Sequence, residues 1–173
     1  MIQSIDKKNI ILTGFMGTGK SSVGKIIAKK LKRNFVDTDL LIEKRQGRTI
    51  PEIFREMGES AFRRMETEVA KELGKKEGLV ISTGGHFMLD PKNIEPLIHT
   101  SRIFCLIATP DEILTRLQND RNHTRPLLDV ANPKKQIIKL LQQREQGYQR
   151  FPRIITDNKQ PADIADNIFE LIS

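Results

Sequence analysis

Apolar runs of the kind that form strands alternate along the chain with longer amphipathic stretches, and this alternation constrains the fold most. The runs are short and rich in apolar residues, whereas the stretches between them carry apolar residues at helical spacing. The expected strands are Asn9–Thr13, Asn34–Val36, Leu79–Ser82, Arg102–Ile107 and Ile154–Thr156. This pattern predicts a three-layer α/β/α fold with a mostly parallel five-stranded sheet. Ligands of such sheets bind at the carboxyl ends of the strands.

The length of the chain fits one domain, which we expect to span residues 1–173. Hydrophobic residues make up 38% and charged residues 29%, and the mean hydropathy is -0.41, as in a folded globular protein. Apolar runs such as Ile103–Ala108 are far shorter than the roughly 20 residues of a membrane helix, and the first residues lack a signal-peptide core. We therefore expect a cytoplasmic protein without a membrane partner.

The net charge of +7 and the pI near 9.6 suit either nucleic acid or small anionic substrates. The positive residues are scattered, and with no Trp and one Tyr the chain offers little aromatic surface for stacking bases. Small anionic substrates are the favoured interpretation, and no nucleic-acid partner is expected. The lone Cys105 lies in an apolar run, which is typical of a buried structural thiol.

The strongest motif is GFMGTGKS at residues 14–21, which matches GxxxxGK[ST] between the first expected strand and an amphipathic helix. Its glycines let backbone N–H groups surround phosphates, Lys20 reaches the β- and γ-phosphates of ATP, and Ser21 is a ligand for Mg²⁺. The sequence therefore predicts an ATP-binding phosphate loop. The expected nucleotide contacts in this loop are Gly17, Thr18, Gly19, Lys20, Ser21 and Ser22.

Two carboxylates, Asp37 and Asp39, follow the second expected strand. Residues two apart at a strand end project to the same side, so both carboxylates are expected beside the phosphate loop. One can hold Mg²⁺, and the other can accept a proton from an attacking hydroxyl. The alternative is that one of them only caps the following helix.

A helix expected from about Gly58 to Gly74 carries Arg63 and Glu66 at a spacing that allows an ion pair. A guanidinium held in this way can bind a carboxylate bidentately, although a plain surface salt bridge is the alternative. After the third strand, Gly84 and Gly85 permit close approach of the backbone to a ligand, and Ser82 can touch the Mg²⁺ shell. A simple tight turn explains the two glycines equally well.

The polar, proline-bounded segment 119–133 is a candidate mobile lid. Its Arg121 and Arg125 can fold over ATP and stabilise charge on the transferred group, or can be solvated loop charges. Arg144 lies late in a helix expected over 134–148, close in sequence to Arg153. A solvated helix face is the alternative for these arginines.

Together these motifs resemble the shikimate kinase family. The phosphate loop, FVDTD, GESAFRRME, STGG, RPLL and a late Arg-x-x-x-Tyr occur in the family's order over nearly the whole chain. The resemblance implies a P-loop kinase fold of the nucleoside-monophosphate-kinase type. It also implies transfer of the γ-phosphoryl group of ATP to the 3-hydroxyl of shikimate, a step in the biosynthesis of chorismate and the aromatic amino acids.

The resemblance carries roles over to matching residues. It implies that Asp37 serves Mg²⁺, that Asp39 binds the acceptor hydroxyls and acts as base, and that Lys20 and Arg125 act on the transferred phosphoryl group. The residues expected to bind shikimate are Asp39, Arg63, Gly84, Gly85 and Arg144. Arg116 and Arg153, together with Arg125, are expected on the nucleotide, and nothing demands more than a monomer.

Two positions depart from the family pattern. His86 stands where the family has a third glycine, and Arg144-Glu-Gln-Gly-Tyr148 lacks the usual proline and leucine between the arginine and the tyrosine. A changed acceptor is therefore one alternative, namely a kinase of another small polyol or hydroxy acid. The other is an ATP-binding regulatory protein without turnover.

Overall fold

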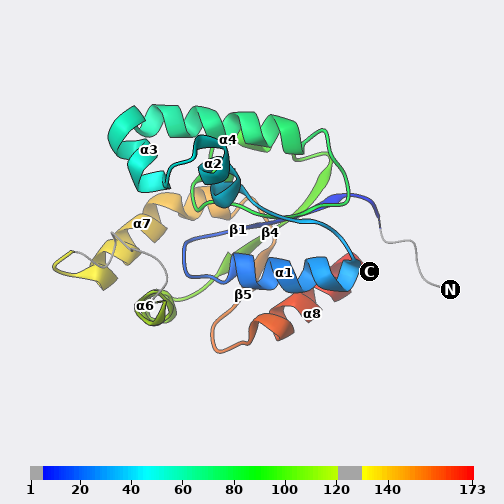
Figure 1. Ribbon diagram of the computed structural model, residues 1–173. Coiled ribbons are helices and arrows are strands. Elements are labelled where there is room, and N and C mark those ends of the chain that lie inside the picture. Colours follow the sequence, from blue (N-terminus) through cyan, green and yellow to red (C-terminus); the bar gives the residue numbers. More distant parts are fainter. Residues whose placement is uncertain (1–5, 121–129) are drawn as a thin grey trace.

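The computed structural model describes residues 6–120 and 130–173, and its centre is a parallel sheet of five strands (Figure 1). The spatial order is β2-β3-β1-β4-β5, and all four strand pairs are parallel. The strands are β1 (Asn9–Thr13), β2 (Phe35–Asp37), β3 (Val80–Ser82), β4 (Ser101–Ile107) and β5 (Arg153–Ile155). The sequence-based prediction of a parallel α/β sheet is confirmed, with strand ends that differ by one residue at most.

Eight α-helices and one 3-10 turn are described around this sheet. They are α1 (Lys20–Leu31), α2 (Thr38–Gln46), α3 (Ile50–Met57), α4 (Glu59–Leu73), η1 (Phe87–Leu89), α5 (Pro91–Ile94), α6 (Pro110–Asn119), α7 (Pro133–Tyr148) and α8 (Pro161–Ile172). In Figure 1, α1 and α8 lie below the sheet, whereas α4 and α2 lie above it. Both chain ends lie on the side away from α3 and α6.

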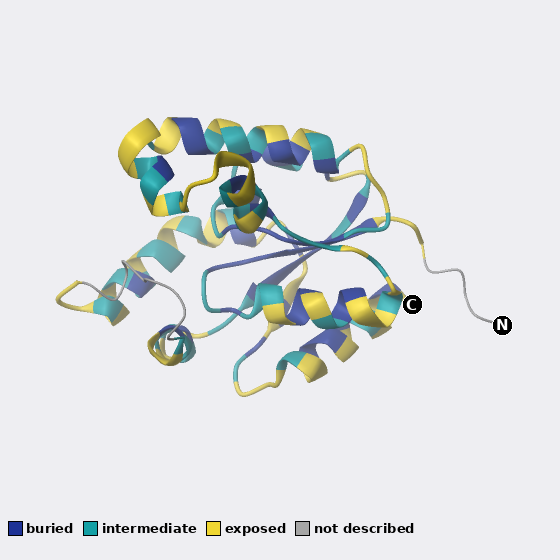
Figure 2. Ribbon diagram, in the orientation of Figure 1, coloured by how far each residue is buried: buried dark blue, intermediate teal, exposed yellow. Residues whose placement is uncertain are grey.

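Side chains of the central strand alternate between two hydrophobic cores. Ile10 and Leu12 of β1 belong to the core under α1 and α8, and Ile11 between them belongs to the core on the other face. All three are fully buried, and the central strands of the sheet are coloured as buried in Figure 2. Because hydrophobic cores cover both faces of the sheet, residues on both sides of each strand are apolar. This explains why the strands appear in the sequence as short continuous apolar runs.

The helix starts follow local sequence signals. Thr49 begins α3 with a capping box, in which its hydroxyl accepts from Glu52 N and the Glu52 carboxylate accepts from Thr49 N. By contrast, α1 begins at Gly19, which has no side chain that could cap the first turn. The first N–H groups of α1 are therefore available to an anion.

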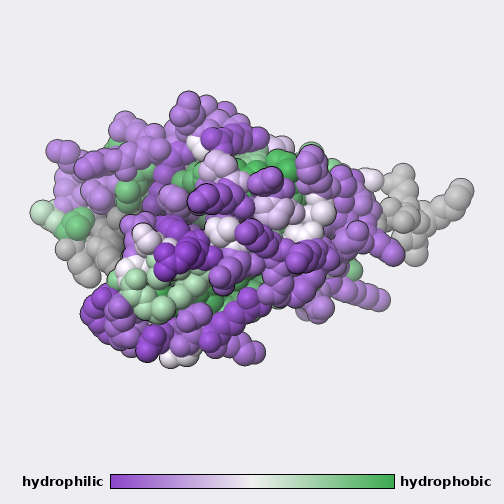
Figure 3. All heavy atoms as spheres, turned by 90° about the horizontal axis from the view of Figure 1, so that it is seen from above, coloured by the Kyte–Doolittle hydropathy of each residue, from purple (hydrophilic) through white to green (hydrophobic). Residues whose placement is uncertain are grey.

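The outer surface is mainly hydrophilic on the face seen in Figure 3, where apolar side chains show as small separate patches. Within residues 6–120 and 130–173, none of the helices is both long and apolar enough to cross a membrane. The exposed large apolar side chains are Leu40, Met57, Ile98, Val130, Ile155 and Leu171.

Candidate functional site

The phosphate loop connects the carboxyl end of β1 to the amino end of α1, as the motif predicts. Gly14 is required there, because its φ is 132° and a Cβ would overlap the carbonyl oxygen of Leu106. The ammonium of Lys20 lies over the loop and donates to the carbonyl oxygens of Gly14 and Phe15, at 2.9 and 2.8 Å. The Lys20 ammonium and the amino end of α1 thus belong to the same loop, as the binding of phosphates requires.

An oxygen cluster lies beside the loop. Ser21 Oγ donates to Asp37 Oδ2 at 2.8 Å, and it lies 3.1 Å from Ser82 Oγ. The other oxygen of Asp37 accepts from the backbone N–H groups of Asp39 and Leu40 and so caps α2. The capping interpretation of Asp37 is confirmed, whereas its role in binding Mg²⁺ stays a prediction, which the oxygen that faces Ser21 favours. Ser21 and Asp37 offer the hard oxygen ligands that Mg²⁺ prefers.

Asp39 reaches the loop from a helix and not from a strand. The strand-end argument for its side chain is wrong, because β2 ends at Asp37 and Asp39 is the second residue of α2. Burial, reinforced by the charge of Asp37, raises the pKa of Asp39 to about 6, while Lys20 and Arg63 act in the opposite direction. Its buried Oδ1 has no hydrogen-bond partner among the described residues. Such a carboxylate can accept a proton.

Gly84 packs directly against Asp39. An added Cβ at Gly84 would come within 2.5 Å of Asp39 Oδ1, and Gly84 N donates to the hydroxyl of buried Thr38 at 3.1 Å. Glycine is therefore required here because of the close approach to Asp39, whereas the predicted approach of the Gly84 backbone to a ligand stays a prediction. We name residues 83–86 the acceptor loop.

Arg63 projects from α4, whose buried stripe contains Phe62, Val69 and Leu73. The predicted ion pair is present, because Nη1 of Arg63 lies 2.8 Å from Glu66 Oε2. Burial raises the pKa of Glu66 to about 7, against the opposing effect of Arg63.

Arg63 has a second carboxylate partner that the sequence-based interpretation missed. Glu59 Oε1 accepts from its Nε at 3.2 Å and from its Nη2 at 2.9 Å. The spacing of four residues on one helix was the available signal.

Arg144 and Tyr148 reach the acceptor loop from the last two turns of α7. The Tyr148 hydroxyl donates to Gly85 O at 2.6 Å, and an added Cβ at Gly85 would lie 3.2 Å from Arg144 Nη1. The Arg144 guanidinium also lies 5.3 Å from the ring centroid of Phe15, in the phosphate loop. Gly147 allows this packing, because a Cβ there would overlap Leu89 of η1. The unusual Arg144–Tyr148 segment thus still directs its arginine to Gly85.

His86 follows the two glycines and is half-buried. Its Nδ1 is buried without a partner among the described residues. Burial, together with the charges of Arg63 and Arg144, lowers the pKa of His86, so its neutral form is favoured.

Arg116 connects the phosphate loop to the end of β5. Its guanidinium donates to Gly17 O at 3.2 Å, to Thr156 Oγ1 at 3.0 Å and to Thr156 O at 2.7 Å. Arg153 is exposed at the start of β5, with Glu145 of α7 at 3.8 Å. The structure thus brings Arg116, but not Arg153, into contact with the phosphate loop.

Arg121, Arg125 and most of the candidate lid lie outside the described residues. Cys105 is buried beneath the loop, and burial raises the pKa of its thiol to about 12, in keeping with a structural role.

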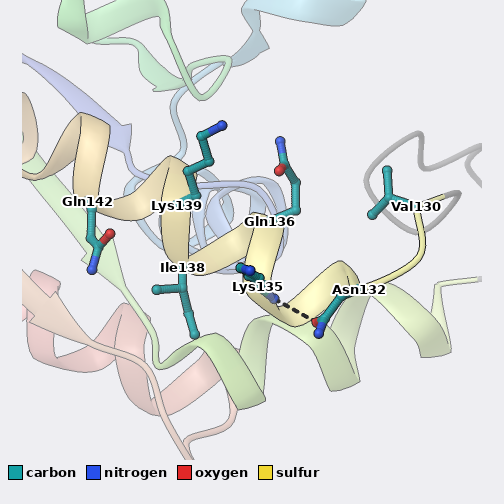
Figure 4. A pocket seen from close by; sticks show the side chains of 7 residues that line it. All are labelled: Val130, Asn132, Lys135, Gln136, Ile138, Lys139 and Gln142. Atoms are coloured by element: carbon teal, nitrogen blue, oxygen red, sulfur yellow. Dashed lines mark hydrogen bonds between the residues drawn. The ribbon is translucent and has the colours of Figure 1, made fainter.

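A separate hollow of about 530 Å³ lies along the amino-terminal half of α7 (Figure 4). Its lining residues are Val130, Asn132, Lys135, Gln136, Ile138, Lys139 and Gln142. Val130 and Asn132 belong to the candidate lid segment 119–133, whereas the other five residues lie on α7, from which their side chains extend on different sides. None of the seven is among the individual residues predicted for the site.

Comparisons with known proteins agree on one family. The sequence model of the family described as "Shikimate kinase" matches residues 16–173. The shikimate kinase of Thermodesulfovibrio yellowstonii is 46% identical over 164 residues, which cover 94% of each chain. That of Thermus thermophilus is 41% identical over 162 residues, which cover 93% of this chain and 88% of the relative.

Solved structures give the same result. Shikimate kinase from Acinetobacter baumannii in complex with shikimate matches with a TM-score of 0.88 and 38% identity, over 97% of this chain and 94% of that chain. A gluconokinase from Sinorhizobium meliloti 1021, at 17% identity and a TM-score of 0.63 over 96% and 91% of the two chains, shares the fold alone. With this match over most of its length, the chain belongs to the shikimate kinase family, phosphotransferases that act on an alcohol group.

Proposed function

We propose that this protein transfers the γ-phosphoryl group of ATP to the 3-hydroxyl of shikimate. The observation that carries the proposal is the meeting of two groups of residues at one edge of the sheet. Lys20 of the phosphate loop and Arg63 of α4 both lie close enough to Asp39 for their charges to act on its pKa. A phosphoryl donor fits the first group of residues, and an acceptor that bears a carboxylate fits the second.

In this mechanism Asp39 accepts the proton of the attacking hydroxyl, while Arg63 and Arg144 bind the carboxylate of shikimate. The backbone of Gly84 and Gly85 lines the acceptor side. Lys20 leaves the carbonyl oxygens of its own loop to bind the transferred phosphoryl group, where its charge stabilises the transition state. We assign Arg116 to nucleotide binding, and the roles of Arg125 and Arg153 rest on the family resemblance alone.

We further propose that the protein binds Mg²⁺ together with ATP. Ser21 and Asp37 would hold it, since their oxygens already lie together beside the loop. When bound, the ion neutralises charge on the phosphates. We also propose that the protein acts as a monomer in the cytoplasm, where ATP is supplied.

A coupled assay of ADP release tests the function. We expect acceptor-dependent turnover with shikimate and a much lower kcat/KM with gluconate and other small polyols. Comparable turnover with another polyol would assign a different acceptor. ATP binding without turnover on any acceptor would indicate a regulatory protein and contradict the proposal.

A further inference from the structure

Arg63, the residue proposed to bind the acceptor carboxylate, is already engaged by two carboxylates of its own helix. Glu59 takes the Nε and Nη2 donors, at 3.2 and 2.9 Å, and Glu66 takes an Nη1 donor at 2.8 Å. The Nε and Nη2 groups form the side-on edge through which a guanidinium binds a carboxylate at two points. That edge is occupied by Glu59 in the free protein.

The two glutamates differ in how readily they can move. The Glu66 side chain is 1% exposed, whereas that of Glu59 is 64% exposed. Breaking a buried ion pair leaves an uncompensated charge in the protein, but an exposed pair within one helix contributes little and its carboxylate returns to water. Glu66 therefore fixes Arg63 in place, and Glu59 is the displaceable partner.

The charges also favour displacement. The charge of Glu59 alone offsets that of the guanidinium, even while Glu66, whose pKa is about 7, is only partly ionised, so Arg63 attracts a third carboxylate weakly while Glu59 stays. Glu59 is close to the acceptor side, because its charge acts on the pKa of His86 in the acceptor loop. Its departure removes one negative charge from the region that a carboxylate must enter.

We propose that Glu59 is an internal competitor for the acceptor carboxylate, occupying the Nε–Nη2 edge of Arg63 until the acceptor displaces it. The inference rests on the proposed function, since it takes Arg63 as the acceptor-binding residue. Because the exchange occurs on binding, Glu59 weakens ground-state affinity for the acceptor and leaves the chemical step unchanged. The expected signature is an effect on KM alone.

The test compares Glu59→Gln with Glu56→Gln, which removes the carboxylate of an exposed ion pair between Glu56 of α3 and Arg48. Glutamine keeps the length of the side chain but not its charge. For Glu59→Gln we expect the KM for shikimate to fall about two- to fivefold, the range for an exposed ion pair. We expect kcat and the KM for ATP to stay at parental values, and Glu56→Gln to change none of the three. Glu59→Ala should shift the KM in the same direction.

A KM for shikimate in Glu59→Gln that equals or exceeds the parental value would overturn the proposal, because Glu59 would then be neutral or would help to hold Arg63. The methyl ester of shikimate provides a second measurement. Calorimetric affinity for this uncharged probe should be equal in parent and variant, and a gain there too would contradict competition for the carboxylate. Failure of the proposed function is seen separately, as absence of shikimate turnover in the parent.

Discussion

Several side chains of the site make two kinds of contact at once. Asp37 caps α2 through one oxygen and accepts from Ser21 through the other. Lys20, in turn, donates to the carbonyl oxygens of its own loop in the absence of nucleotide. Such contacts satisfy polar groups before ligands arrive, so each ligand exchanges one set of hydrogen bonds for another. Asp39 differs, because its buried Oδ1 has no partner among the described residues.

The Asp39→Asn variant tests whether Asp39 is the general base that accepts the proton of the attacking hydroxyl. We expect kcat to fall by at least about a hundredfold, because general-base catalysis contributes about 10²–10⁴-fold. In the active parent, kcat/KM should rise with pH through about 6, the pKa of Asp39, as the carboxylate loses its proton. A kcat within threefold of the parent would contradict the role of Asp39.

The same variant makes a prediction about stability. The folded pKa of Asp39 is raised from 3.8 to about 6, so the folded protein binds a proton here that the unfolded chain has already lost. The parent therefore loses stability as the pH rises between these values. Asp39→Asn should be more stable than the parent at pH 8, by about 3 kcal/mol, and the difference should shrink toward pH 4. Urea unfolding at both pH values measures this, with the exposed Glu170→Gln as control.

His86→Gly tests the residue that departs from the family pattern. Its imidazole follows Gly85 and lies within range of the charges of Arg63 and Arg144, on the acceptor side. If the ring narrows the space for shikimate, the variant should have a severalfold lower KM for shikimate with unchanged kcat and KM for ATP. His99→Gly, at an exposed position, is the control. An unaltered KM for shikimate would mean that the imidazole lies outside the acceptor space.

At the scale of elements, α7 and the acceptor loop form one unit. Tyr148 donates to Gly85 O from the last turn of α7, and Gly147 lets the helix approach Leu89 of η1. One turn earlier on the same helix, Arg144 lies beside Gly85. The orientation of Arg144 therefore depends on how α7 packs against this loop.

Tyr148→Phe removes the hydrogen bond that joins these elements. Burial raises the pKa of Tyr148 to about 12, so the hydroxyl remains a donor throughout the working pH range. Without the Tyr148 hydroxyl, Gly85 O loses its hydrogen-bond partner, and Arg144 is no longer held in a fixed position. We therefore expect the KM for shikimate to rise about three- to tenfold. The KM for ATP should not change. Steady-state kinetics against the exposed α7 variant Gln146→Ala check this, and an equal rise in both KM values would indicate a general loss of packing.

The sequence predicts elements better than it predicts contacts between them. The strands and the phosphate loop follow from local apolar runs and a fixed motif, and both are confirmed. Asp39 was assigned to the wrong kind of element because a short strand passes into a helix at Asp37 without a break in pattern. The bond from Tyr148 to Gly85 joins residues 63 apart in the chain, and no local pattern encodes such a distance.

At the scale of the molecule, the site consists of two halves that meet at the carboxyl edge of the sheet. The nucleotide half contains the phosphate loop, α1 and Arg116, and the acceptor half contains α4, the acceptor loop and the end of α7. Charged residues of both halves act on Asp39, since Lys20 and Arg63 both lower its pKa. Arg144 also joins the two halves, because its guanidinium lies 5.3 Å from the ring centroid of Phe15 in the phosphate loop.

Removal of Mg²⁺ should impair the function of the nucleotide half and leave shikimate binding by the acceptor half unchanged. Ser21 and Asp37, the proposed ligands, belong to the nucleotide half, whereas Arg63 and Arg144 bind a carboxylate without a metal. With EDTA we expect turnover to fall at least about a hundredfold, because charge on the phosphates is no longer neutralised. Calorimetric affinity for shikimate in nucleotide-free protein should stay the same. Asp37→Asn should raise the Mg²⁺ concentration needed for half-maximal turnover while keeping the cap of α2, since asparagine also caps helices. Turnover that persists in EDTA, or shikimate affinity that is lost with the metal, would contradict this division.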